Sequence, residues 1–304
     1  MGVVLKFENL IEDLDKFIEQ SNGYFNLRDY SYIEPIGIAI LKSIALEEQY
    51  STGKVLKYIK PTDDKVHSYM RTMLFNDYNK NKTYVPIERV DYQNLDSAKR
   101  KIVAKILEVD DFRQLSEEDR KDLGNYIDYM VGELLDNALK HAQSPIGAVV
   151  CAQYFRTQGK LQVAVVDRGV GFFANISRNY AVRTEAEAIA KALEKGVSSP
   201  SGVSYASTLN SAGYGLYVLK EILKYTYGSL IILSNDGAIK YNGNEDKIER
   251  FDKVSNLWKG SAVVFEFYEE NINHPLDEFF KIYIYPDNEE DPEDIFDVFL
   301  LDDI

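Results

Sequence analysis

The first third of the chain alternates between two hydrophobic spacings. Apolar residues at every second position predict strands, and apolar residues three and four apart predict amphipathic helices. Residues 23–33 and 54–61 have the strand spacing, and residues 35–51 and 63–79 have the helical one. Pro35 falls at a predicted helix start, where a missing N–H is tolerated. This order favours a small α/β domain over residues 1–84.

The remaining two thirds continue the alternation with longer elements. Residues 85–114 begin extended and finish helical, which predicts a connector. Residues 115–143 are strongly helical, and Ser116 with Asp119 has the spacing of a capping box. The later elements are a hairpin (147–156 and 160–168), helices (184–196 and 214–226) and strands (228–235 and 261–269), with a polar insert at 242–260. Residues 271–304 form an extension with an acidic tail.

Composition and charge narrow the class of protein. The 304 residues include 35 Lys and Arg against 49 Asp and Glu, a net charge of −14 that makes nucleic acid an unfavourable partner. The single cysteine, Cys151, lies in a predicted strand and is expected to be a buried packing residue. No apolar run approaches the roughly 18 residues of a membrane span, and the N-terminus lacks the pattern of a signal peptide. We therefore expect a cytoplasmic protein with no membrane partner.

One predicted helix carries polar side chains on an otherwise apolar surface. Glu133, Asn137 and His141 lie four residues apart and so share a face, beside apolar rows over residues 127–138. This much apolar surface indicates a buried helix. A buried carboxylate and a buried amide need partners, which predicts a functional site.

Two glycine-containing motifs follow this helix. Asp167 ends an apolar strand and is followed by Gly169 and Gly171, and Gly213 and Gly215 open a later helix. The phosphate loop Gly-x-x-x-x-Gly-Lys-Ser/Thr does not occur anywhere in the sequence. The motifs together predict a nucleotide site of another kind.

The Glu-x-x-x-Asn helix, Asp-x-Gly-x-Gly, Gly-x-Gly and the strand "KGSAVVFEF" follow one another in an order that resembles the GHKL ATPase superfamily. The resemblance covers residues 115–268. It implies a Bergerat-type ATP-binding domain over 115–270, an α+β two-layer sandwich of the α/β class, with ATP and Mg²⁺ as cofactors. Residues 172–212 match the segment that closes over the triphosphate. Arg168, Arg178 and Arg183 are candidate phosphate contacts among which the spacing selects none.

The resemblance assigns roles to the motif residues. Asn137 can lend Mg²⁺ a neutral amide oxygen, and Glu133, one turn earlier, stands at the position of the general base. Asp167 would accept a hydrogen bond from the adenine amine, with glycines leaving room for the purine. The helix opened by Gly215 would turn its N-terminus to the phosphates. The remaining nucleotide-binding candidates are Lys140, His141, Gly169, Gly171, Ser211, Gly213, Leu216 and Ser261, the last in the place of a Thr.

The front of the chain has a resemblance of its own. Residues 25–44 are similar to the central strand, turn and helix of STAS domains, the anti-sigma antagonist fold. Glu34 and Pro35 stand where that family has Asp and the phosphorylated Ser. Because proline has no hydroxyl, this STAS-like domain is expected to accept no phosphate there. GHKL kinases and STAS proteins act together in bacterial partner-switching systems, which favours signalling with protein partners.

Three functions remain open at this point. The first is a bacterial regulatory protein that hydrolyses Mg-ATP, with Glu133 as base, to switch its protein contacts. The second is a serine/threonine kinase of the anti-sigma type, in which Glu133 activates a hydroxyl of the partner. The third is a module that senses ATP or ADP without turnover. The sequence leaves open the partner, the upstream signal, the role of the tail and the oligomeric state, a homodimer included.

Overall fold

The computed structural model describes residues 3–19, 24–75, 83–197 and 215–285. A seven-stranded sheet, antiparallel throughout, runs through the centre, in the order β10-β9-β8-β11-β7-β6-β5. Its strands are β5 (Tyr84–Val90), β6 (Ala148–Phe155), β7 (Lys160–Asp167), β8 (Ser229–Ser234), β9 (Gly237–Asn242), β10 (Lys247–Asp252) and β11 (Ser261–Phe267). The mixed α/β class expected from the sequence is confirmed.

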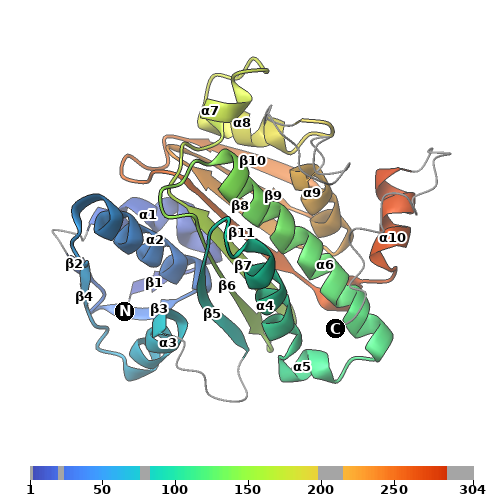
Figure 1. Cartoon of the computed structure of the whole chain (residues 1–304), viewed down its shortest axis with the longest axis horizontal. Coiled ribbons are helices and arrows are strands. Elements are labelled where there is room, and N and C mark those ends of the chain that lie inside the picture. The colour runs from blue at the N-terminus through green and yellow to red at the C-terminus, as the bar shows by residue number, and fades with distance from the viewer. Residues whose placement is uncertain (1–2, 20–23, 76–82, 198–214, 286–304) are drawn as a thin grey trace.

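Helices cover one face of this sheet (Figure 1). The main ones are α4 (Leu95–Leu107), α6 (Glu117–Asp136) and α9 (Gly215–Tyr225). Shorter elements are α5 (Asp110–Arg113), α7 (Phe173–Ile176), α8 (Glu185–Ala192), α10 (Leu276–Phe279), the 3₁₀ turn η3 (Glu269–Asn271) and the π-helical turns η2 (Asn137–His141) and η4 (Phe280–Ile284). Ser116 caps α6, because its Oγ accepts from the Asp119 N–H at 3.0 Å. No helix in the described ranges has the length and apolarity to cross a bilayer.

The N-terminal segment (residues 3–75) covers the opposite face of the sheet (Figure 1). It contains β1 (Val3–Leu5), η1 (Phe7–Asn9), α1 (Leu10–Glu19), β2 (Tyr24–Asn26), β3 (Tyr30–Ile33), α2 (Pro35–Thr52), β4 (Lys57–Ile59) and α3 (Asp64–Phe75). Strands β1 and β3 pair in parallel, as do β2 and β4, in two separate two-stranded sheets. Pro35 is the first residue of α2, as expected.

Strand periodicity explains why both faces of the large sheet are apolar. In β7, Val163 and Val165 pack with the helix layer, whereas Ala164 and Val166 pack with the N-terminal segment. Residues Ile36 to Leu41 of α2 are buried on that second face. The molecule therefore has three layers, and the N-terminal segment shares a core with the sheet.

Three segments differ from their sequence-based expectations. The segment 85–114, expected as a connector, supplies the edge strand β5 and the helices α4 and α5, which belong to the same core as α6. The polar insert contains β10 and the turn before it, and it begins at the last residue of β9, the strand that pairs with β10. The sequence pattern did not predict β10, because this edge strand carries charged, exposed residues. The single strand expected at 23–33 is divided by a turn into β2 and β3.

The sole cysteine tests the packing of α2 on the sheet. The Cys151 thiol is fully buried in β6, with its Sγ 3.5 Å from the Pro35 carbonyl oxygen, and burial raises its pKa above the usual value. We expect no reaction with a thiol reagent in native buffer and one equivalent of label in urea. Rapid labelling of the native protein, followed by absorbance, would contradict the packing described here.

Candidate functional site

A cavity opens between α6, the ends of β7 and β11, and the start of α9. It encloses about 870 Å³, including the part open to solvent. Eight of the residues singled out from the sequence line it: Glu133, Asn137, His141, Asp167, Gly171, Gly215, Leu216 and Ser261. They come from four separate stretches of the chain, which the fold brings together. Ser211 and Gly213 lie outside the described residues.

Glu133 is the most unusual group in this cavity. Only 7% of its surface is exposed, and within the described part of the chain its carboxylate receives no hydrogen bond and no ion pair. Burial, helped by the neighbouring charge of Asp136, raises its pKa to about 7. Gly215, the first residue of α9, lies against it, since a Cβ there would be 1.9 Å from Glu133 Oε2. The start of α9 thus touches the carboxylate directly.

The helix that carries Glu133 ends in an unusual way. Asn137 to His141 form a π-helical turn, a geometry that often occurs at functional sites. The carbonyls at this end accept hydrogen bonds from other elements: Leu139 from the Tyr92 hydroxyl, His141 from Asn175 Nδ2 at 3.0 Å and Ala142 from the Val170 N–H at 2.8 Å. Half-buried Asn137 lines the cavity and makes no side-chain hydrogen bond to any described residue.

Asp167 forms a second buried carboxylate, at the end of β7. Its Oδ1 accepts from the N–H groups of Gly169 at 2.8 Å and Ser261 at 3.3 Å. The Ser261 hydroxyl is a further partner. Burial still raises the pKa of Asp167 to about 6, because desolvation outweighs these hydrogen bonds. The loop and the start of β11 therefore fix the carboxylate in place.

The two glycines after Asp167 allow close contacts of this loop with its neighbours, and one of them also lines the cavity. A Cβ at Gly169 would lie 1.9 Å from the Ala142 carbonyl oxygen, so this glycine lets the loop touch the end of the helix, and it does not line the cavity. Gly171 lines the cavity with a φ of 80°, in the left-handed region that favours glycine. A Cβ there would meet Asn235, Ser234 and Glu185.

The side chains of Ser234, Asn235 and Glu185 form a hydrogen-bonded clamp around the loop that follows Asp167, and those of Ser234 and Glu185 are buried. Glu185 Oε2 accepts from Ser234 Oγ at 2.7 Å and from the Phe173 N–H at 3.0 Å. Its Oε1 accepts from Asn235 Nδ2 at 2.6 Å, and Asn235 also donates to the Val170 carbonyl. The clamp ties α8 and the β8–β9 turn to the loop that follows Asp167.

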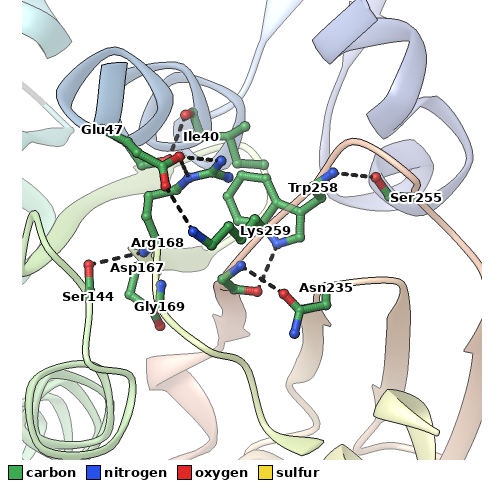
Figure 2. A network of polar contacts seen from close by, with 12 residues as sticks. Ile40, Glu47, Ser144, Asp167, Arg168, Gly169, Asn235, Ser255, Trp258 and Lys259 are labelled. Carbon is green, nitrogen blue, oxygen red and sulfur yellow. Dashed lines mark hydrogen bonds and ion pairs between the residues drawn. The ribbon is translucent and has the colours of Figure 1, made fainter. Parts of the chain in front are cut away.

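Two cationic candidates point away from the cavity. Lys140 is exposed and pairs with Asp136 at 2.6 Å, so the expectation that it binds the nucleotide lacks support from its position. Arg168 reaches to the opposite side of the sheet, where its Nε donates to Glu47 of α2 at 2.7 Å (Figure 2). Arg178 and Arg183 do not line the cavity either.

The cavity also contains residues that the sequence did not single out one by one. Val165 and Val263 are one strand period from Asp167 and Ser261, so the alternation of β7 and β11 could have identified them. Asn175 and Ile176 lie on α7, within the segment 172–212 expected to close over a triphosphate, of which residues 198–212 lie outside the described residues. The remaining additional lining residues are Leu134, Ala138, Ala142, Phe172, Ala192 and Val197. Most of these are apolar, which suits a flat, largely apolar ligand part.

A metal ion at this site would need ligands from outside the protein. Among the described residues, no group of three or more His, Cys, Asp or Glu side chains could hold one. The side chains of Asn137 and Glu133, which have no hydrogen-bond partner within the described ranges, fit an ion that takes its other ligands from phosphate oxygens and water.

Comparisons with known proteins leave the family open. No model of a known protein family matches the chain, and no curated protein is significantly similar to it in sequence.

The buried Glu133 predicts how stability changes with pH. Its pKa of about 7 in the folded state exceeds the ordinary 4.5, so its contribution to stability is present below about pH 4.5 and is lost as the pH rises through 7. Above pH 7 the charged group costs at most about 3 kcal/mol. Glu133→Gln is therefore expected to stabilise the unliganded protein at pH 8 and to change little at pH 4.5, measured by urea unfolding. The exposed Glu245→Gln serves as control, and a destabilised Glu133→Gln protein at pH 8 would contradict the argument.

Proposed function

We propose that this chain is a bacterial regulatory protein of the GHKL type that binds Mg-ATP in the cavity and hydrolyses it to switch protein contacts. The observation that supports this most is that residues of four separate motifs line one cavity, with two buried carboxylates in its wall. The motif order, the central antiparallel sheet and the covering helices also suit a Bergerat-type domain.

The Asp167 side of the cavity suits an adenine ring. The carboxylate can accept from the exocyclic amine, while Ser261 and its own loop hold it in place. Val165 and Val263 supply apolar surface from the same sheet face. In this proposal, nucleotides without an amine at that position lose a hydrogen bond to the buried carboxylate, which gives selectivity.

The Glu133 side suits the reacting phosphate. Asn137 would hold Mg²⁺ together with phosphate oxygens and water, and the bound ion would offset the charge on the phosphates. Glu133, with a pKa of about 7, can accept a proton from a nucleophile near neutral pH. The nucleophile is water in a hydrolase and a partner's hydroxyl in a kinase, so the anti-sigma-type serine/threonine kinase is retained as the alternative.

The N-terminal segment is the reason for proposing a signalling role. Its α2 begins at Pro35 after Glu34, where STAS relatives would carry the phosphorylated Ser. Glu34 is buried and accepts from the Phe7 N–H at 2.7 Å, so it serves the packing of this segment. We propose a STAS-like, phosphate-independent unit that contributes to contacts with protein partners in the cytoplasm.

A γ-labelled ATP experiment separates the proposed reactions. We expect the wild-type protein to release labelled phosphate, Glu133→Ala to bind ATP with release reduced by about 100-fold or more, and Asn137→Ala to lose Mg-dependent binding. Label transferred to a partner from the genomic neighbourhood would favour the kinase. Binding with neither product would favour a sensing module and contradict hydrolysis.

Calorimetry with an Asp167 variant tests the adenine end. Asp167→Ala is expected to weaken ATP binding by about 10- to 100-fold and to remove the preference for ATP over GTP, because a charged hydrogen-bond acceptor is lost. Asp236→Ala, an exposed aspartate on the β8–β9 turn, is the matched control. Equal ATP affinity in Asp167→Ala and wild-type protein would contradict the assignment.

A further inference from the structure

The residue after Asp167 connects the cavity to the N-terminal segment. Arg168 is 6% exposed, and its guanidinium makes two contacts with Glu47 Oε2 on α2, at 2.7 Å from Nε and 2.6 Å from Nη2 (Figure 2). Its Nη1 is buried without a hydrogen-bond partner in the described structure. The charge of Arg168 is therefore balanced mainly by Glu47, from the opposite layer of the molecule.

Glu47 also contacts the strand start on the other side of Asp167. Its Oε1 lies 3.6 Å from Lys259 Nζ, two residues before Ser261, which donates to Asp167. One carboxylate of α2 thus contacts both segments that frame the Asp167 carboxylate. Figure 2 shows Arg168 and Lys259 converging on Glu47 from the two neighbouring strand ends.

Trp258 packs against the guanidinium of Arg168. Its ring lies 4.6 Å from the Arg168 guanidinium carbon, and its Nε1 donates to the Gly260 carbonyl at 3.1 Å. Gly260 has a φ of 92°, and a Cβ there would lie 2.4 Å from the Asp167 carbonyl oxygen and 2.7 Å from Arg168 Cα. The backbone at Asp167 is therefore in tight contact with the segment that holds Trp258, and a shift of Arg168 would be transmitted to it.

We propose that Glu47 and Arg168 are positioning residues that hold the Asp167 end of the cavity in its binding geometry, so that docking of the N-terminal segment and binding of an adenine nucleotide strengthen each other. This inference rests on the proposed function. Neither side chain lines the cavity, and the effect passes through the backbone of Asp167 and Gly169. Because such coupling is reciprocal, ATP must stabilise the docked α2 by the same factor by which docking raises ATP affinity.

The first test measures ATP affinity by calorimetry in isosteric variants. Glu47→Gln removes the charge that balances Arg168 and is expected to weaken ATP binding by about 3- to 30-fold. Glu48→Gln, at the next residue on α2, is the matched control, because the Glu48 side chain accepts from Thr52 Oγ1 on the same helix at 2.9 Å. In a double-mutant cycle, Arg168→Gln combined with Glu47→Gln should bind ATP no more weakly than the worse single variant.

The second test follows amide hydrogen exchange across residues 35–52 with and without ATP. ATP should slow exchange in the wild-type protein and have no effect on this helix in Glu47→Gln, a readout that a purely structural role would not change. The emission of Trp258, the only tryptophan in the chain, reports the stacked Arg168 in parallel. Should Glu47→Gln fail to fold, Lys259→Gln removes only an exposed side chain and is expected to weaken ATP binding about twofold.

The outcomes separate the two proposals. A wild-type protein that does not bind ATP overturns the proposed function and this inference with it. A wild-type protein that binds ATP, with unchanged affinity in Glu47→Gln and in Lys259→Gln, overturns only the inference. ATP binding without any change in the exchange of residues 35–52 also overturns it, whereas weakened binding together with lost protection supports it.

Discussion

Two carboxylates, Glu133 and Asp167, are buried in the wall of one cavity, and the free-energy cost of placing them there explains much of the local structure. Asp167 receives hydrogen bonds from its own loop and from Ser261, yet burial still raises its pKa to about 6. Glu133 has no such partner among the described residues, and its pKa rises to about 7. A fold keeps groups of this kind when a ligand or a reaction uses them.

Close backbone contacts hold the elements around these carboxylates together. Gly169 lets the loop after β7 touch the end of the helix at Ala142, and Gly215 lets α9 begin against Glu133. Gly260, just before β11, lets the backbone there lie against the backbone of Asp167. In each case a side chain would displace the neighbour, so the shape of the cavity depends on three glycines from different parts of the chain.

The large elements and much of the cavity wall could be predicted from the sequence. The four-residue spacing predicted that Glu133, Asn137 and His141 share a side, and all three line the cavity, Glu133 from α6 and the other two from η2. The sequence could not show that β5 belongs to the sheet, because edge pairing depends on distant partners, nor that the N-terminal segment packs on the same sheet. Nor could it show that Lys140 forms an ion pair with Asp136 outside the cavity lining. The direction of Arg168 depends on Glu47, over a hundred residues earlier.

The central claim is that this cavity holds an adenine nucleotide between the Asp167 and Glu133 carboxylates. A crystal structure of the full chain with Mg²⁺ and a non-hydrolysable ATP analogue tests it most directly. The account predicts the adenine amine within hydrogen-bond distance of Asp167 and a magnesium ion on the Asn137 amide oxygen. An analogue bound elsewhere, or a cavity left vacant at saturating nucleotide, would contradict it.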